Sequence, residues 1–171
     1  MNRVFAWSIF ASLCGGAALA EDRWDHRGSL GLLLGTGYEV GETRSTSGVL
    51  ASGSRLDADL GGTYALPGSN DEILMFLRGG FLGGRVDLSL TGGYRGYFGL
   101  DEFKTFFDAG LSVHATPYWS VGPRVGLGVQ YEFSPVVGAY VSLAGQLGAG
   151  NGVRYDAEVT TGLQFRSFLL E

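Results

Sequence analysis

Polar and apolar residues alternate along the chain from residue 28 almost to its end. The segment VRYDAEVTTGLQFR, residues 153–166, shows this clearly, because a polar residue or glycine occupies every second position and no charged residue lies between them. A period of two is typical of a β-strand with two chemically different faces. The pattern therefore predicts strands and no helix of convincing length.

Turn-forming segments divide the pattern into eight predicted strands. PGSND at 67–71, SP at 134–135 and GNG at 150–152 indicate short turns, since Gly, Pro and Asn favour turns. The stretch 41–53 is longer, and its Ser and Gly residues predict a mobile loop. The predicted strands are 28–40, 54–66, 72–82, 85–99, 103–116, 120–133, 136–149 and 153–169.

Each predicted strand keeps its charged side chains on one face and its apolar side chains on the other. The charged face also holds Glu39 and Lys104. We predict that the ionisable residues on this face form one network, with a structural or gating role. The predicted network consists of Arg55, Asp57, Asp59, Arg78, Arg85, Asp87, Arg95, Asp108, His114, Arg124, Glu132, Arg154, Asp156, Glu158 and Arg166.

Two barrel architectures fit such strands: a soluble, lipocalin-like barrel with the apolar face inside, and a transmembrane barrel with that face against lipid. Many glycines lie on the charged face, where they would make room in the narrow lumen of eight strands. Aromatic residues of the apolar face cluster near strand ends, as in the girdles of membrane barrels. We therefore predict an all-β fold, an eight-stranded antiparallel up-and-down transmembrane β-barrel with a polar, charge-filled lumen, over residues 28–170.

The first twenty residues predict a secretory signal peptide. They begin with the basic MNR, continue with the apolar VFAWSIFASL, and end with small residues at Ala18 and Ala20, the three-part pattern of such signals. A buried N-terminal helix is the alternative. Residues 21–27 are then expected to form a periplasmic segment. No apolar run reaches the ~20 residues of a membrane helix.

Composition excludes several function classes. The formal net charge is −5 and the Lys and Arg residues do not cluster, which argues against nucleic acid as a partner. The single cysteine, Cys14, lies in the predicted signal peptide, and the two histidines, His26 and His114, lack ligand spacing. We therefore expect neither a metal nor a cofactor.

The strand pattern and its length resemble the small eight-stranded outer-membrane barrels of Gram-negative bacteria, the group that includes the OmpA membrane domain and OmpX. The resemblance implies an outer-membrane protein with both termini in the periplasm. It also implies contact with outer-membrane lipid and lipopolysaccharide, handling by the barrel-assembly machinery, and a monomeric state. One feature departs from the group: such barrels usually end on an aromatic residue, whereas this chain ends Leu169-Leu170-Glu171.

Three functions remain open on the sequence alone. The first is a non-catalytic structural or interaction role, with the lumen closed by salt bridges. The second is a narrow gated pore for ions or small solutes. The third is a lipid A-modifying acyl enzyme, because Ser112 and His114 share a strand face with Asp108 and such groups serve acyl transfer.

Pairs of carboxylates raise a further catalytic possibility. Asp57 and Asp59, like Asp156 and Glu158, lie two residues apart on one face, a spacing near that of paired-carboxylate hydrolases. The nearly equal numbers of opposite charges on that face favour salt bridges instead. We therefore predict no enzyme and no catalytic residues.

The pairing within the network follows from the predicted strand order. We expect Asp156 and Glu158 to pair across the lumen with arginines of other strands, such as Arg78, Arg85 and Arg124.

Overall fold

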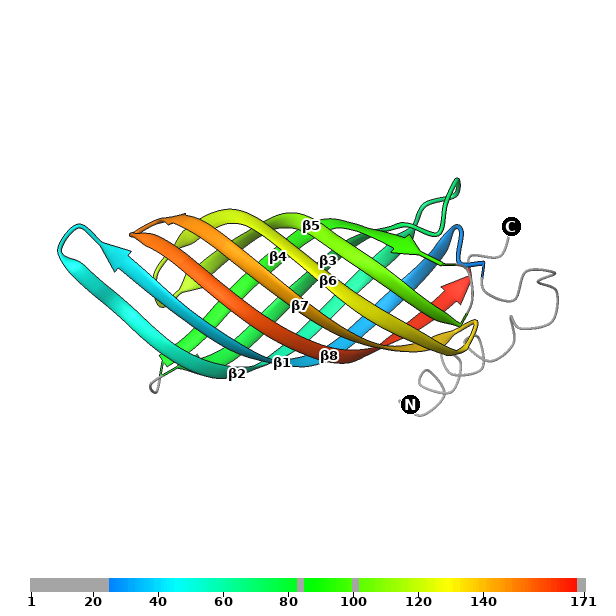
Figure 1. Ribbon diagram of the computed structural model, residues 1–171, viewed down its shortest axis with the longest axis horizontal. Helices are drawn as coiled ribbons and strands as arrows, with labels where there is room; N and C mark the ends of the chain where they lie inside the picture. Colours follow the sequence, from blue (N-terminus) through cyan, green and yellow to red (C-terminus); the bar gives the residue numbers. More distant parts are fainter. Residues whose placement is uncertain (1–24, 83–84, 100–101, 169–171) are drawn as a thin grey trace, which may run out of the picture.

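The chain forms a closed antiparallel β-barrel (Figure 1). The structure, a computed structural model, describes residues 25–82, 85–99 and 102–168. The predicted signal peptide, 1–20, lies outside the described residues. The strands are β1 (Ser29–Ser45), β2 (Gly48–Ala65), β3 (Glu72–Leu82), β4 (Arg85–Phe98), β5 (Phe103–Thr116), β6 (Ser120–Ser134), β7 (Val137–Gly150) and β8 (Val153–Phe168).

Each strand pairs with the next along the chain, and β8 pairs with β1 to close the wall. The closing register runs from Ser29 opposite Phe168 to Arg44 opposite Val153. A closed ladder satisfies the backbone hydrogen bonds of its wall without water. A strand in the hydrocarbon of a bilayer requires this, because no water is available there. The predicted fold class is confirmed. No helix among the described residues is long and apolar enough to cross a membrane.

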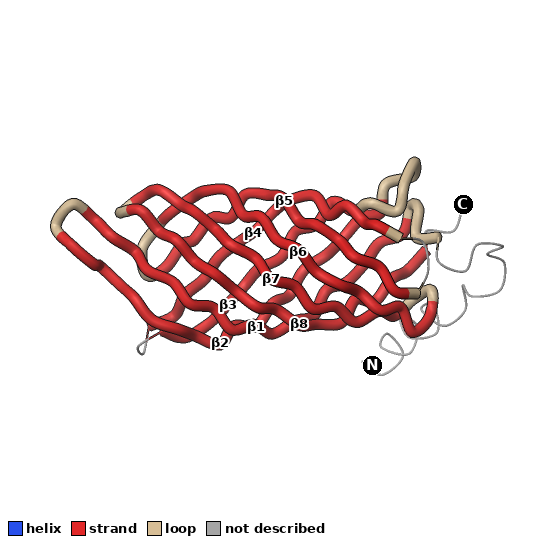
Figure 2. The backbone as a smooth tube through the Cα atoms, in the orientation of Figure 1, coloured by secondary structure: helices blue, strands red, loops and turns tan. Residues whose placement is uncertain are grey.

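The first hairpin corrects the prediction of a mobile loop at 41–53. This segment continues β1 and β2, with Gly41 opposite Gly53 and Glu42 opposite Ser52. Ser and Gly have weak strand preferences, but the facing strand supplies hydrogen-bond partners for their backbone. Figure 2 shows this hairpin projecting beyond the other turns. We call that end of the barrel the distal end, and the end where the described chain begins and finishes the terminal end.

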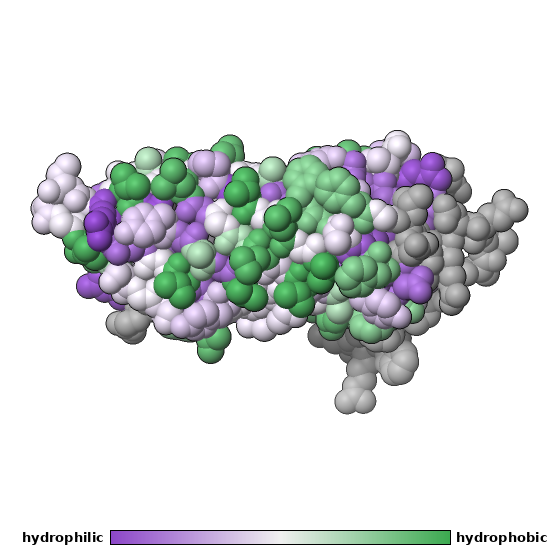
Figure 3. Space-filling view, viewed as in Figure 1, coloured by the Kyte–Doolittle hydropathy of each residue, from purple (hydrophilic) through white to green (hydrophobic). Residues whose placement is uncertain are grey.

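Apolar side chains cover the outside of the wall. Leu56 and Leu127 are 71% and 68% exposed, whereas the inward Arg166 has 0% exposure. Figure 3 shows hydrophobic side chains along the wall and hydrophilic ones gathered toward the two ends. This inverts the arrangement of a soluble protein and fits a wall that faces lipid.

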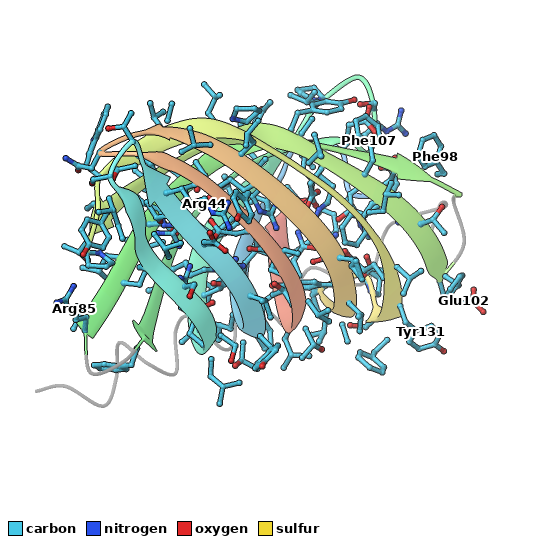
Figure 4. The ribbon with its side chains drawn as sticks, turned by 60° about the vertical axis from the view of Figure 1, so that its left-hand side comes forward. Arg44, Arg85, Phe98, Glu102, Phe107 and Tyr131 are labelled. Carbon is cyan, nitrogen blue, oxygen red and sulfur yellow. The ribbon has the colours of Figure 1, made fainter. Side chains whose placement is uncertain are left out.

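Aromatic rings gather on the outside at the terminal end, where Figure 4 labels Phe98, Phe107 and Tyr131. The Phe98 and Phe107 centroids lie 5.9 Å apart, and those of Tyr131 and Phe133 lie 5.2 Å apart. Such rings favour the boundary between hydrocarbon and headgroups. They mark the terminal end of the lipid-facing band.

The turn between β2 and β3 is held by one carboxylate. Asp71 accepts hydrogen bonds from the Tyr94 hydroxyl at 2.5 Å, the Tyr97 amide at 3.1 Å and the Ser69 hydroxyl at 3.1 Å. Burial acts to raise the pKa of Asp71, but these hydrogen bonds to the charged form lower it overall. Asp71 therefore fastens the turn to β4 as long as it is ionised.

We predict that the pH response of this turn follows Asp71. Because the folded pKa is lowered, the contribution to stability is complete above the ordinary Asp value of about 4 and disappears as the pH falls through the lowered pKa. The Tyr97 amide resonance should shift during that acid titration, and it should not shift in Asp71→Asn. A midpoint at or above the ordinary Asp value would contradict the assignment.

A second prediction concerns the lipid-facing wall. Leu60 is 55% exposed on β2, five residues before the strand ends at Ala65. Leu60→Arg should lower the free energy of unfolding by about 2–4 kcal/mol, since the charge would lie near the middle of the bilayer. Reversible unfolding in lipid vesicles measures this. Val49→Arg, in the projecting hairpin, is the control, and equal losses in both variants would show that the band is misplaced.

Candidate functional site

The lumen is filled by ionisable side chains that the strand alternation turns inward. Of the fifteen residues in the predicted network, fourteen are buried and Arg85 is the exception. The buried charges fall into three groups along the barrel, which we call the distal, central and terminal layers.

The distal layer consists of Glu39, Arg55, Asp57, Asp87, His114, Arg154 and Asp156. Arg55 contacts Glu39 and lies 3.0 Å from Asp57 and 3.1 Å from Asp87. Arg154 lies 3.1 Å from Asp87, 3.2 Å from Glu39 and 2.6 Å from Asp156. Each guanidinium therefore serves three carboxylates, which the five donors of arginine permit.

The central layer consists of Asp59, Arg78, Arg95, Asp108, Arg124 and Glu158. Arg78 binds Asp59 through two bonds of 2.7 and 2.8 Å, and Arg95 binds Asp108 through bonds of 2.7 and 3.0 Å. Glu158 accepts hydrogen bonds from both Arg78 and Arg124. Two-point pairing of this kind fixes the relative orientation of the guanidinium and the carboxylate and also balances their charges.

The terminal layer consists of Glu72, Lys104, Glu132 and Arg166 with the polar His26, Tyr97, Gln130 and Gln164. Arg166 lies 2.8 Å from Glu132 and 3.1 Å from Glu72. Gln164 donates to Glu72 at 2.9 Å. Lys104 Nζ lies 3.0 Å from His26 Nε2, so the segment before β1 reaches into this end of the lumen.

Aromatic side chains inside the lumen support the central layer. The Arg95 guanidinium lies 3.9 Å from the Phe106 ring centroid and 5.4 Å from that of Tyr140. Arg78 and Arg124 lie 5.5 and 5.2 Å from the Phe76 centroid. These cation–π contacts stabilise arginines that have left water.

Sequence reasoning missed the inward aromatic and aliphatic residues. Leu33, Phe76, Phe106 and Tyr140 are all buried. A signal for them was present, because each lies in a run of adjacent apolar residues, such as 73–77, that breaks the alternation. The polar Glu72, Tyr97, Gln130 and Gln164 of the terminal layer were also missing from the predicted network.

Arg85 contradicts the prediction of a lumenal position. It is exposed at the start of β4 and donates to the Tyr118 hydroxyl at 3.2 Å. Figure 4 shows it at one end of the barrel, pointing away from it. Strand parity alone placed it inward, but here the strand has passed the distal layer, and both faces of it are exposed.

The pairing hypothesis is correct for one carboxylate and wrong for the other. Glu158 pairs with Arg78 and Arg124 across the lumen. Asp156 instead pairs with Arg154, two residues away on its own strand. Arg154 reaches it because neighbours two apart on a strand share a face.

The residues that suggested acyl transfer do not form a triad. His114 contacts Asp87 at 3.2 Å, Asp108 pairs with Arg95, and the Ser112 hydroxyl is 2.9 Å from that of Thr91. Each group has a partner outside the supposed triad. Among the described residues, no group of three or more His, Cys, Asp or Glu is arranged to hold a metal ion.

The space left in the ionic interior is small. A cavity of about 10 Å³ lies in the central layer between Arg78, Arg95 and Arg124, and another of about 10 Å³ lies at the distal mouth beside Arg55 and Arg154. Each has room for about one water molecule.

Comparison with known proteins shows the fold. No protein-family model and no curated protein sequence matches the chain. Neisserial surface protein A (NspA) is 14% identical with a TM-score of 0.59, over 81% of this chain and 99% of that one. A de novo designed transmembrane β-barrel is 18% identical with a TM-score of 0.50, over 83% and 98%. The N-terminal β-barrel domain of Pseudomonas aeruginosa OprF is 16% identical with a TM-score of 0.49, over 78% and 99%.

The chain thus has the fold of the small transmembrane β-barrels. The identities are too low to carry more than the fold from those proteins to this one.

We predict that Glu158 is the most sensitive position in the central layer. Glu158→Gln keeps the shape but leaves Arg78 and Arg124 without their shared anion, so the free energy of unfolding should fall by about 3–5 kcal/mol. Chemical unfolding in vesicles measures the loss. The matched control is Glu42→Gln, whose exposed pair with Arg44 should contribute little. Similar losses in the two variants would contradict the central role of Glu158.

Proposed function

We propose that this protein is an outer-membrane β-barrel with a non-catalytic structural or interaction role and a lumen closed by salt bridges. The observation that carries the proposal is the central layer. There Glu158 of β8 joins Arg78 of β3 and Arg124 of β6, so the ion pairs reach across the lumen between separate parts of the wall.

The sizes of the cavities support a closed lumen. The central cavity of about 10 Å³ holds about one water molecule, which favours a lumen that a hydrated ion does not cross. Opening such a path would require several buried charges to separate from their partners, at several kcal/mol for each pair that is broken.

One prediction and one observation support the proposed outer-membrane location. The predicted signal peptide at 1–20 would export the chain, and a closed barrel with an apolar outer surface suits insertion into that membrane. In the proposed arrangement both termini are periplasmic and the projecting β1–β2 hairpin lies outside. The proposal includes contacts with outer-membrane lipid and lipopolysaccharide, insertion by the barrel-assembly machinery, and a monomeric state.

A narrow gated pore is the second candidate, and one contact favours it. Arg124 binds Glu158 and also has Asp108 within 3.8 Å. If Arg124 changed its partner from Glu158 to Asp108, its guanidinium would move within the lumen and would stay paired with a carboxylate.

The third candidate, lipid A modification, has less support because Ser112, His114 and Asp108 have separate partners. Mass spectrometry of lipid A from cells with and without the gene tests it directly. A change in acylation that depends on the gene would restore the enzyme hypothesis.

We predict that the purified protein does not conduct ions in planar bilayers. The double variant Arg124→Ala/Glu158→Ala should conduct, because it removes both members of a pair and leaves a gap in the central layer. The pair Glu42→Ala/Arg44→Ala, on the hairpin, is the control and should remain closed. Discrete channels in the wild-type protein would favour the gated pore instead.

A further inference from the structure

The charges buried in the lumen do not balance. Among the described residues the lumen holds nine carboxylates but seven arginines and lysines, an excess of two negative charges. The carboxylates are those of Glu39, Asp57, Asp59, Glu72, Asp87, Asp108, Glu132, Asp156 and Glu158, and the cations are Arg55, Arg78, Arg95, Lys104, Arg124, Arg154 and Arg166. An uncompensated charge away from water is costly.

The excess lies in the distal layer. The central layer has three carboxylates and three arginines, and the terminal layer has two carboxylates with Arg166 and Lys104. The distal layer has four carboxylates against Arg55 and Arg154. Arg78 approaches Glu39 to 3.7 Å, but it is already bound by Asp59 and Glu158.

His114 lies between two of the distal carboxylates. Its Nδ1 is 3.2 Å from Asp87 Oδ1, and its Nε2 is 4.0 Å from Asp156 Oδ2. The side chain is 2% exposed, and Nε2 has no hydrogen-bond partner in the lumen. If Nδ1 donates to Asp87, a neutral ring directs the Nε2 lone pair toward the anionic Asp156, which is unfavourable. A proton on Nε2 turns that repulsion into attraction.

The other charged residues of the distal layer have a negative balance. Arg55 and Arg154, which share Asp87 with the ring, oppose a further positive charge. The four distal carboxylates favour it, and Asp57 Oδ2 is itself buried without a partner. Ser89 of β4 and Ser120 of β6 lie opposite His114 in the strand register. The other charged residues of the distal layer are Glu39 of β1, Arg55 and Asp57 of β2, Asp87 of β4, and Arg154 and Asp156 of β8.

We propose that His114 is a proton-binding site, held as an imidazolium ion between Asp87 and Asp156. The protonated ring is then the third cation of the distal layer, and it links His114 of β5 to Asp156 of β8.

The second histidine provides an internal comparison. His26 is equally buried in the terminal layer, where its Nε2 lies 3.0 Å from Lys104 Nζ and 3.3 Å from Glu132 Oε1. Burial, with the charges of Arg166 and Lys104, lowers the pKa of His26 to about 2. We therefore expect a neutral ring at His26.

Nitrogen-15 NMR of the protein labelled on histidine tests the proposal in the folded wild-type protein. The chain has two histidines, so two imidazole signals are expected from the barrel in detergent micelles. Near neutral pH, His114 should show the nearly equal nitrogen shifts of an imidazolium ion, and His26 the widely separated shifts of a neutral ring. A neutral ring at His114 under these conditions overturns the proposal, and no variant has to fold for this result.

A pair of variants then tests whether Asp156 stabilises the imidazolium ion of His114. Asp156→Asn should shift the His114 signals toward the neutral form at the same pH. Glu102→Gln removes an exposed carboxylate at the opposite end of the barrel and should leave them unchanged. Unchanged His114 signals in Asp156→Asn, or an equal change in both variants, would show that Asp156 does not stabilise the imidazolium ion and would contradict the proposed site.

Discussion

The hydrogen-bond demand of a backbone in hydrocarbon governs this structure. A strand surrounded by lipid must find every donor and acceptor on a neighbouring strand, and only a closed wall provides this for all strands at once. Pairing of β8 with β1 completes the wall. Once it is closed, apolar side chains face lipid, and the polar side chains share a lumen that is only just wide enough for them.

The narrow lumen determines how the charges are arranged. Side chains from different strands meet inside it, so a single arginine reaches carboxylates on two or three strands, as Arg55 and Arg154 do. Rings such as Phe76 and Phe106 fill the space that ions cannot fill and lie against the guanidinium groups. The interior acts as a polar core that ion pairs between separate strands hold together.

The differences among the three layers have a local cause. The central and terminal layers balance their charges with arginine and lysine, so their ion pairs are complete without a titratable base. The distal layer has too few arginines for its carboxylates, and the residue in the gap is a histidine. The distal layer, at the end of the lumen nearest the projecting hairpin, is thus the one layer of the described lumen in which carboxylates outnumber arginines and lysines.

The sequence by itself determined the strands, their two faces and the inverted barrel, because the alternation of polar and apolar residues is a local property of each strand. It also placed fourteen of the fifteen predicted network residues on the buried face. Only the tertiary structure decided the partners: Glu158 reaches Arg78 and Arg124, whereas Asp156 remains with Arg154. Register and strand length set these contacts, and both depend on the neighbouring strands. For the same reason Arg85 lies outside the lumen, and the Ser- and Gly-rich stretch 41–53 forms paired strands instead of a loop.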